Sequence, residues 1–216
     1  MSDLTRKHAV MSASLEARTT KQSYLILAML AAVSTLGLAH AGTAIAQPAE
    51  PKVKILAAMA DPLKKAVLVG RVSTGDMTLQ LEIEGAESMW MQMGNPPVWG
   101  AHAPRADERY HVEFKLTDPK SKTRIPYADV VFSATNRDTG KVMTLTLAPM
   151  WGSSGLHYSG NSALLGDGAY SAITTVSVPT FQRELTDKDL WSKPVSAKFH
   201  FKVKDGMLTE VSEDRS

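Results

Sequence analysis

The residues of this sequence best suited to chemistry are methionines and histidines. Thioether sulfur favours Cu(I), imidazole suits copper or iron, and carboxylate suits harder ions. Met150 stands at the end of a predicted strand, and His157 follows a glycine- and serine-rich segment. A flexible loop there can fold the imidazole back toward the sulfur, which predicts a transition-metal site. The alternative is that Met150 fills one end of the core while His157 only caps the loop.

A second pair of candidate ligands is His111 and Glu113, in the sequence His-Val-Glu. Side chains alternate between the two faces of a strand, so both point to the same side, about 7 Å apart at about 3.3 Å per residue. An imidazole and a carboxylate at this separation can bind one ion or two neighbouring ions. The alternative is a solvated strand face, because Lys115 continues the same row.

A third candidate is the row of Met89, Met91 and Met93, which would share one face of a short strand. Methionine usually fills gaps in a core, and an exposed thioether row that binds copper is the alternative. His102, in the Gly/Pro-rich segment that follows, could join this row. His200 lies between two phenylalanines and is expected to be an ordinary surface or edge histidine.

Several other kinds of chemistry find no support. The 216-residue chain has no cysteine, which excludes disulfides, thiolate nucleophiles, iron–sulfur clusters and blue-copper centres. Residues 152–155 are one position too short for a serine-hydrolase elbow, and residues 166–168 lack the third glycine of a dinucleotide-binding loop. The net charge of +2, from 24 basic and 22 acidic residues, gives no reason to expect nucleic acid as a partner.

Residues 1–46 have the features of a secretory signal peptide. Basic residues precede an uncharged run from Tyr24 to Leu38, and the small-residue patterns Ala-His-Ala and Ala-Ile-Ala follow it. The run is shorter than the roughly 20 residues of a spanning helix. We therefore expect a periplasmic protein that starts at Met1 or Met11, is cleaved before Gln47 and has no membrane span in its mature chain. An uncleaved anchor is the alternative.

The elements that must position the candidate ligands are predicted to be strands, because apolar side chains recur at every second position. The predicted strands are Ala66–Val72, Met77–Ile83, Ser88–Met93, Tyr110–Thr117, Tyr127–Thr135, Val142–Ala148, Ala169–Val178 and Ala197–Val203. This pattern predicts an all-β fold, an immunoglobulin-like antiparallel β-sandwich. We expect the sandwich at residues 66–204, a flexible lead-in at 47–65, a polar tail at 205–216 and a long loop at 149–163.

Taken together, these features resemble the small periplasmic copper-binding proteins that act beside a high-affinity iron permease. The resemblance covers about residues 66–204. It rests on His111-Val-Glu113, on the turn at 136–140 that leads to Pro149-Met150, and on Gly155-Leu-His157-Tyr158 followed by Gly160-Asn161. It implies an immunoglobulin-like homodimer whose metal sites lie near the dimer interface, with Met150, His157, His111 and Glu113 as ligands.

The sequence departs from the family in one respect. Members usually supply a further histidine before the last strand, and this chain has Arg183 in that segment. A copper site without that histidine would be incomplete, weaker or rebuilt with Met93 or His102.

The resemblance further implies a metal-binding component of ferrous-iron uptake that works with an inner-membrane iron permease. Copper is the expected cofactor, with iron as a second ion. We expect a transport accessory protein rather than a turnover enzyme, with a ferroxidase-like role left open. The alternative is a periplasmic copper chaperone or copper-tolerance protein that uses the methionine row. A third interpretation is a metal-free sandwich that only makes protein contacts.

Overall fold

A computed structural model describes residues 48–215. The predicted signal peptide and its cleavage sites lie outside this range. Within it, the chain forms twelve strands and one short 3-10 helix, Leu185–Asp187. The strands are β1 (Val53–Ala60), β2 (Val67–Thr74), β3 (Met77–Gly85), β4 (Met89–Met93), β5 (Val98–His102), β6 (Tyr110–Thr117), β7 (Val130–Asn136), β8 (Val142–Gly152), β9 (Gly155–Ser162), β10 (Gly168–Val176), β11 (Val195–Lys204) and β12 (Met207–Ser212). No helix of the described residues is long and apolar enough to cross a membrane.

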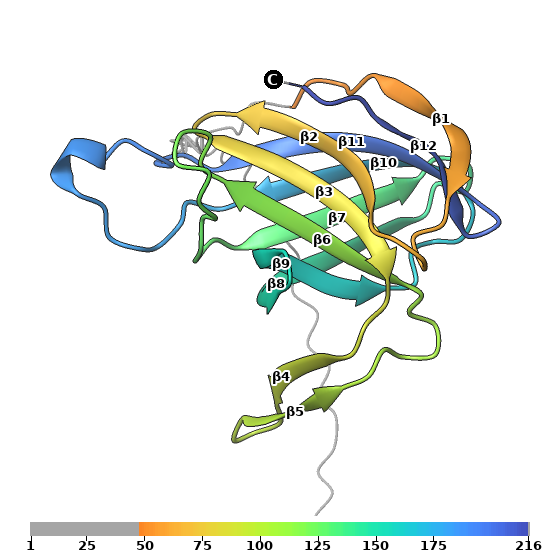
Figure 1. Ribbon diagram of the computed structural model, residues 1–216, viewed down its shortest axis with the longest axis horizontal. Coiled ribbons are helices and arrows are strands. Elements are labelled where there is room, and N and C mark those ends of the chain that lie inside the picture. The colour runs from red at the N-terminus through yellow and green to blue at the C-terminus, as the bar shows by residue number, and fades with distance from the viewer. Residues whose placement is uncertain (1–47, 216) are drawn as a thin grey trace, which may run out of the picture. The chain divides into compact units, whose positions relative to one another are not determined.

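Ten strands form one continuous antiparallel sheet, in the order β1-β12-β11-β10-β7-β8-β9-β6-β3-β2, and β4 and β5 form a separate hairpin (Figure 1). The sheet folds over on the long strand β8. The first half of β8 pairs with β7 and its last five residues pair with β9. The two halves of the sheet thereby make the two layers of a sandwich. The all-β antiparallel fold predicted from the sequence is confirmed.

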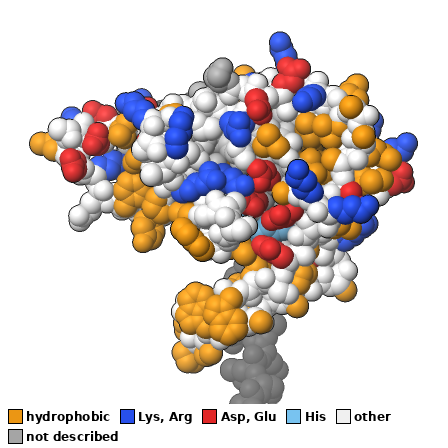
Figure 2. Space-filling view, in the orientation of Figure 1, with side chains coloured by type: hydrophobic (Ala, Val, Ile, Leu, Met, Phe, Trp, Pro, Cys, Tyr) orange, Lys and Arg blue, Asp and Glu red, His pale blue; other side chains and the backbone are white. Residues whose placement is uncertain are grey.

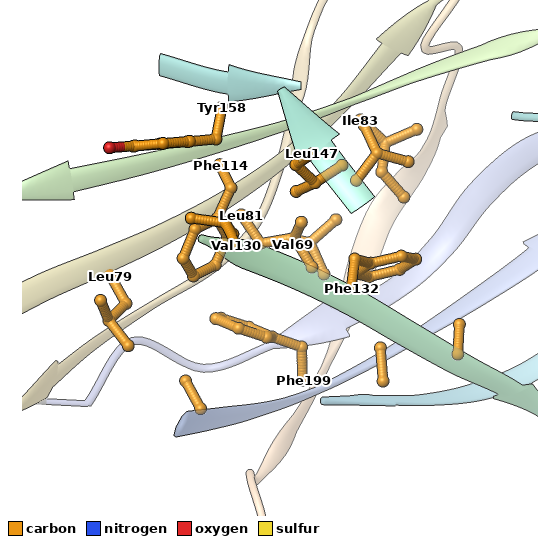
Figure 3. Packing of buried hydrophobic residues seen from close by; sticks show 14 of the residues in the cluster. Val69, Leu79, Leu81, Ile83, Phe114, Val130, Phe132, Leu147, Tyr158 and Phe199 are labelled. Carbon is orange, nitrogen blue, oxygen red and sulfur yellow. The ribbon is translucent and has the colours of Figure 1, made fainter. Parts of the chain in front are cut away.

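The core lies between the two layers because apolar side chains alternate along the strands. Leu79, Leu81 and Ile83 of β3 are fully buried. Figure 3 shows Phe114 of β6 and Phe199 of β11 beside them, and these two rings meet edge to face with centroids 6.1 Å apart. Each such burial contributes about 1.5–3 kcal/mol. Because this alternation fixes the inward side chains, it also fixes which side chains of β3 and β6 point out of the sandwich.

The sandwich closes where β2 approaches β11 and β12. A Cβ atom on Gly70 would lie 2.9 Å from Cβ of Ser212 and 3.2 Å from the ring of Phe199. Only glycine therefore allows the two layers to come this close. The end of the described chain strengthens this closure, because the Ser73 amide donates a hydrogen bond to the carbonyl oxygen of Arg215.

Both ends of the described chain differ from expectation. The segment expected to be a flexible lead-in contains strand β1. The segment expected to be a polar tail contains strand β12, which pairs with both β1 and β11. β1 is mostly exposed, so its sequence carries no alternating apolar pattern and its backbone pairing alone makes it a strand. β12 buries Leu208 and Val211 against the core, a contact that depends on the neighbouring strands.

The expected long loop at 149–163 is wrong. β8 continues to Gly152, and β9 begins at Gly155 after a two-residue turn. Gly155 has a φ of +84°, a conformation that glycine adopts at little cost in tight hairpins. The segment contains glycines and serines, and the outer face of β9 is polar. It therefore lacks the apolar alternation from which strands were predicted. This difference matters most for function, because it fixes the position of His157.

Candidate metal centre

A row of polar side chains crosses the outer face of strands β8, β9, β6 and β3. The strand registers pair Met150 with His157, Asn161 with His111, and His111 with Glu84. Directly paired residues of an antiparallel sheet present their side chains on the same face. Register therefore brings together candidate ligands that come from separate segments of the sequence.

Met150 and His157 are cross-strand neighbours in the β8–β9 hairpin, so no loop has to fold back to join them. The Ser159 hydroxyl donates a hydrogen bond to Met150 Sδ at 3.2 Å. His157 Nδ1 lies 2.9 Å from the carbonyl oxygen of Gly155. Because a carbonyl oxygen can only accept, Nδ1 carries the proton and the neutral ring presents a lone pair at Nε2. That Nε2 atom is buried and makes no hydrogen bond within residues 48–215.

His111 is held in the same tautomer by Asn161. The Asn161 amide nitrogen donates to the backbone oxygen of Glu87 at 2.8 Å, and Oδ1 accepts from the Glu87 amide at 3.3 Å. These two contacts fix the orientation of the side-chain amide. His111 Nδ1, 2.9 Å from the same Oδ1, must therefore donate to it. His111 is 0% exposed, and its Nε2 is again without a hydrogen-bond partner in the described part of the chain.

The two imidazoles thus have the features of prepared ligands. Their ring centroids lie 6.4 Å apart, and the angle between the two ring planes is 85°. Metal-binding histidines usually donate their second nitrogen to a carbonyl or carboxylate, which fixes ring and tautomer. Gly155 and Asn161 supply such acceptors for His157 and His111. A nitrogen or sulfur ligand set of this kind suits copper, and the orphaned Nε2 atoms fit a metal ion better than they fit an apolar core.

Glu113 is buried as well, but the protein already engages its carboxylate. Glu113 Oε1 lies 2.9 Å from Lys115 Nζ and accepts a hydrogen bond from the Ser154 hydroxyl at 2.8 Å. Burial acts to raise the pKa of Glu113, but the bonds from Lys115 and Ser154 outweigh it and lower that pKa. Glu113 is therefore ionised at neutral pH. It lies 3.7 Å from Nδ1 of His157, the nitrogen that carries the proton.

The solvated face considered for His111, Glu113 and Lys115 is wrong, since all three side chains are buried. Lys115 is held by a second carboxylate, with its Nζ 2.6 Å from Oε2 of Glu82. The row is thus a buried polar strip on the outer face of β3, β6 and β9. His200, on β11, is partly exposed and lies beside Glu50, as expected of a surface histidine.

The methionine row does not fill the core. Met89, Met91 and Met93 lie on the β4–β5 hairpin, outside the ten-stranded sheet, and Met91 and Met93 are exposed. His102 is directly opposite Met89 in the hairpin register. The exposed thioether row, which was the alternative, describes their position correctly.

Sequence reasoning missed Glu84, Glu87 and Asn161. Alternation along β3 could have placed Glu84 on the outer face, because Leu81 and Ile83 point inward. Glu87 gave no signal, and Asn161 was noted only as part of the Gly160-Asn161 motif, since the roles of both depend on the register of β6 and β9. Arg183 donates hydrogen bonds to the carbonyl oxygens of Pro179 and Trp191, so the guanidinium is engaged within its own loop.

Comparison with known proteins bears on the family. A family model described as "Fe2+ transport protein" matches residues 115–204. This match agrees with the family resemblance drawn from the sequence. The matched range includes Met150 and His157 and begins just after His111 and Glu113. The β8–β9 hairpin, which carries both residues, therefore lies inside the matched range.

The chain is also similar to curated relatives and to solved structures. UPF0423 proteins of Brucella abortus and Brucella suis are 30% identical over 118 residues, which cover 47% of this chain. The match spans 65% of the length of these relatives, slightly less than two thirds. The crystal structure of FetP from uropathogenic E. coli is 25% identical, with a TM-score of 0.55 over 64% of this chain and 96% of FetP. A copper-bound variant of the Campylobacter jejuni protein P19 shares the fold at 21% identity, with a TM-score of 0.52 over 64% of this chain and 98% of P19.

Proposed function

We propose that this protein is an exported copper- and iron-binding component of a ferrous-iron uptake system, acting beside an inner-membrane iron permease. The observation that carries the proposal is the pair of buried imidazoles, His111 and His157, whose Nε2 atoms lack hydrogen-bond partners in the described residues. A buried polar atom left unpaired costs about 1–3 kcal/mol, and a bound metal ion removes that cost. The family match and the copper-bound forms of FetP and P19 support the choice of metals.

Copper would be held by Met150 and His157, with His111 and Glu113 as the adjoining pair. A thioether together with imidazole favours Cu(I), and copper in such a site would supply one-electron redox chemistry. The protein's own contribution is positional. Ser159 orients the Met150 sulfur, and Gly155 fixes the tautomer of the buried His157 ring. The protein would present or condition iron for the permease as a transport accessory rather than turn over as an enzyme.

Competition titration of the purified mature chain with a chromogenic Cu(I) chelator tests this site. Met150→Leu keeps the side-chain volume and removes the sulfur, and His157→Ala removes the imidazole. Loss of one ligand is expected to weaken Cu(I) affinity by about 10–100-fold. Met143→Leu is the matched control, because Met143 lies on the same strand and its sulfur also accepts a hydroxyl hydrogen bond, from Ser162. Unchanged affinity in Met150→Leu and His157→Ala would contradict the proposed copper site.

We further propose that the chain is a homodimer whose interface includes the β4–β5 hairpin. Trp90 and Trp99 on the hairpin are 69% and 57% exposed, and Trp151 on β8 is 79% exposed. These residues line an apolar groove of about 690 Å³ that reaches Met150, and Figure 2 shows apolar side chains gathered on the hairpin. Exposed apolar patches of this kind mark interfaces, and tryptophan is enriched at their centres. A second copy seated there would cover the copper site.

Sedimentation analysis tests the dimer. Trp90→Ser is expected to shift the chain from dimer toward monomer, because it removes a large apolar contact from the groove. Leu185→Ser is the control, since Leu185 is even more exposed than Trp90 but lies on the 3-10 helix. A wild-type monomer, or a Trp90→Ser variant that dimerises like the wild type, would contradict this interface. N-terminal sequencing of periplasmic protein tests export, with Gln47 as the expected first residue.

A second candidate function is copper delivery or copper tolerance through the methionine row. It is favoured by the exposure of Met91 and Met93 and by the cross-strand pair of Met89 with His102. Growth of a deletion strain separates the two functions. Poor growth under iron limitation supports iron uptake, whereas sensitivity to added copper supports the copper function.

A further inference from the structure

We propose a second metal site, for a hard divalent cation of the ferrous or manganous class, formed by the carboxylates of Glu84 and Glu87 and by His111 Nε2. Candidate ligand atoms of these three residues all lie within 4.8 Å of one another. Glu84 is directly opposite His111 in the β3–β6 register, and Glu87 Oε1 is 3.4 Å from His111 Nε2. This second site rests on the proposed function in iron uptake, and it assigns separate ligands to the ferrous ion.

The buried imidazole is aimed into this cluster with a lone pair. Because Asn161 Oδ1 can only accept, His111 Nδ1 donates to it, and Nε2 of the neutral ring is an acceptor. The Glu87 carboxylate opposite also offers only lone pairs. Two acceptors at 3.4 Å repel each other unless a cation lies between them. A proton can serve His111 and Glu87 alone, whereas a metal ion can bind Glu84 as well.

The excess of negative charge around the cluster also favours a bound cation. Lys115 makes its ion pairs with Glu82 and Glu113. Within residues 48–215, no lysine or arginine is paired with Glu84 or Glu87. Burial raises the pKa of Glu84, and the Glu113 carboxylate raises it further, as expected where negative charge is crowded. A cavity of about 230 Å³ gives an ion access, and its lining holds more acidic side chains than the one basic side chain, Lys115.

The donor set selects a harder ion than the Met150 sulfur does. Two carboxylates and one imidazole suit Fe²⁺ or Mn²⁺, whereas a thioether favours Cu(I). Asn161 also ties the site to the backbone, because its amide bonds both backbone groups of Glu87 and orients His111. Glu113, which the sequence had paired with His111, is instead bound to Lys115. The second ion would therefore lie on the β3 side of His111 and leave Met150 and His157 to copper.

Binding of Mn²⁺ to the mature chain, followed by electron paramagnetic resonance, tests this site. Glu84→Gln and Glu87→Gln preserve shape and remove charge, and we expect each to weaken Mn²⁺ binding about tenfold and the double variant about a hundredfold. Glu213→Gln, at an exposed position near the C-terminus, is the control. Cu(I) affinity of the double variant should stay within threefold of the wild type. Met150→Leu should show the reverse pattern, with Cu(I) weakened and Mn²⁺ unchanged.

The outcomes separate this site from the proposed copper function. Unchanged Mn²⁺ affinity in the double variant, or no Mn²⁺ binding by the wild type, overturns the second site even when copper binding follows the proposal above. The spectrum of Mn²⁺ on the wild type gives a test that needs no variant. A ¹⁴N coupling from His111 is expected, and a bound Mn²⁺ without nitrogen coupling overturns the assignment.

Discussion

Replacement of Asn161 by alanine tests how the polar row is held together. Asn161 is buried and makes three hydrogen bonds, two to the backbone of Glu87 and one to His111 Nδ1. At about 1 kcal/mol for each bond, with some relief from water entering the gap, Asn161→Ala should cost about 2–3 kcal/mol of unfolding free energy. For a domain of this size, that lowers the midpoint of thermal unfolding by roughly 5–10 °C.

The same variant has a second, independent readout in the tautomer of His111. In the wild type, the ¹⁵N chemical shifts should show a protonated Nδ1 and an unprotonated Nε2. In Asn161→Ala, the acceptor for His111 Nδ1 is lost, so both tautomers of the ring should be populated. The affinity for Mn²⁺ should then fall by about 10–100-fold. Asn161→Asp is the control, because a carboxylate still accepts from Nδ1. A wild-type ring protonated only at Nε2, or a variant as stable as the wild type, would refute the reasoning.

Three further outcomes follow from the packing and the charges. Phe199→Ala removes a fully buried ring and should cost about 3–5 kcal/mol in urea unfolding, whereas Leu185→Ala should change stability by less than about 0.5 kcal/mol. Because burial raises the pKa of Glu84 above its ordinary value of 4.5, its ionised form opposes folding, and Glu84→Gln should raise the thermal midpoint of the metal-free protein at pH 7. The gain should shrink as the pH falls through the raised pKa of the folded state, and it should be gone below about 4.5. Gly152→Ala would place a Cβ 3.1 Å from the His157 ring, so the ring must shift and Cu(I) affinity should fall about tenfold; an unchanged affinity would argue against the position of His157 in the copper site.

Much of the fold could be predicted from the pattern of apolar residues. β6 was expected with the same boundaries as observed, Tyr110–Thr117, because Tyr110, Val112, Phe114 and Leu116 alternate without interruption. The strands expected at Ala66–Val72 and Met77–Ile83 are present as β2 and β3, which pair with each other. These elements bury one complete face, and burial on one face leaves a period of two in the sequence. β1, β5, β9 and β12 were missed because they lack that period.

The candidate ligands were found by residue type, and their mutual positions were not. Met150, His157, His111 and Glu113 stood out because sulfur, imidazole and carboxylate are the donors that transition metals bind. The expected mechanism for joining Met150 to His157, a flexible loop, was wrong, and a paired hairpin takes its place. The sequence also could not indicate that Lys115 engages Glu113, since that contact depends on rotamers in a buried row.

What the amino-acid sequence determined by itself was local: which segments extend, which side chains face the core, and which residue types could bind a metal. What only the tertiary structure decided was strand register. Register places Glu84 opposite His111, His111 opposite Asn161, and Met150 opposite His157. The physical reason is that a shift of one residue between strands would preserve every local propensity and still send each of these side chains to the other face.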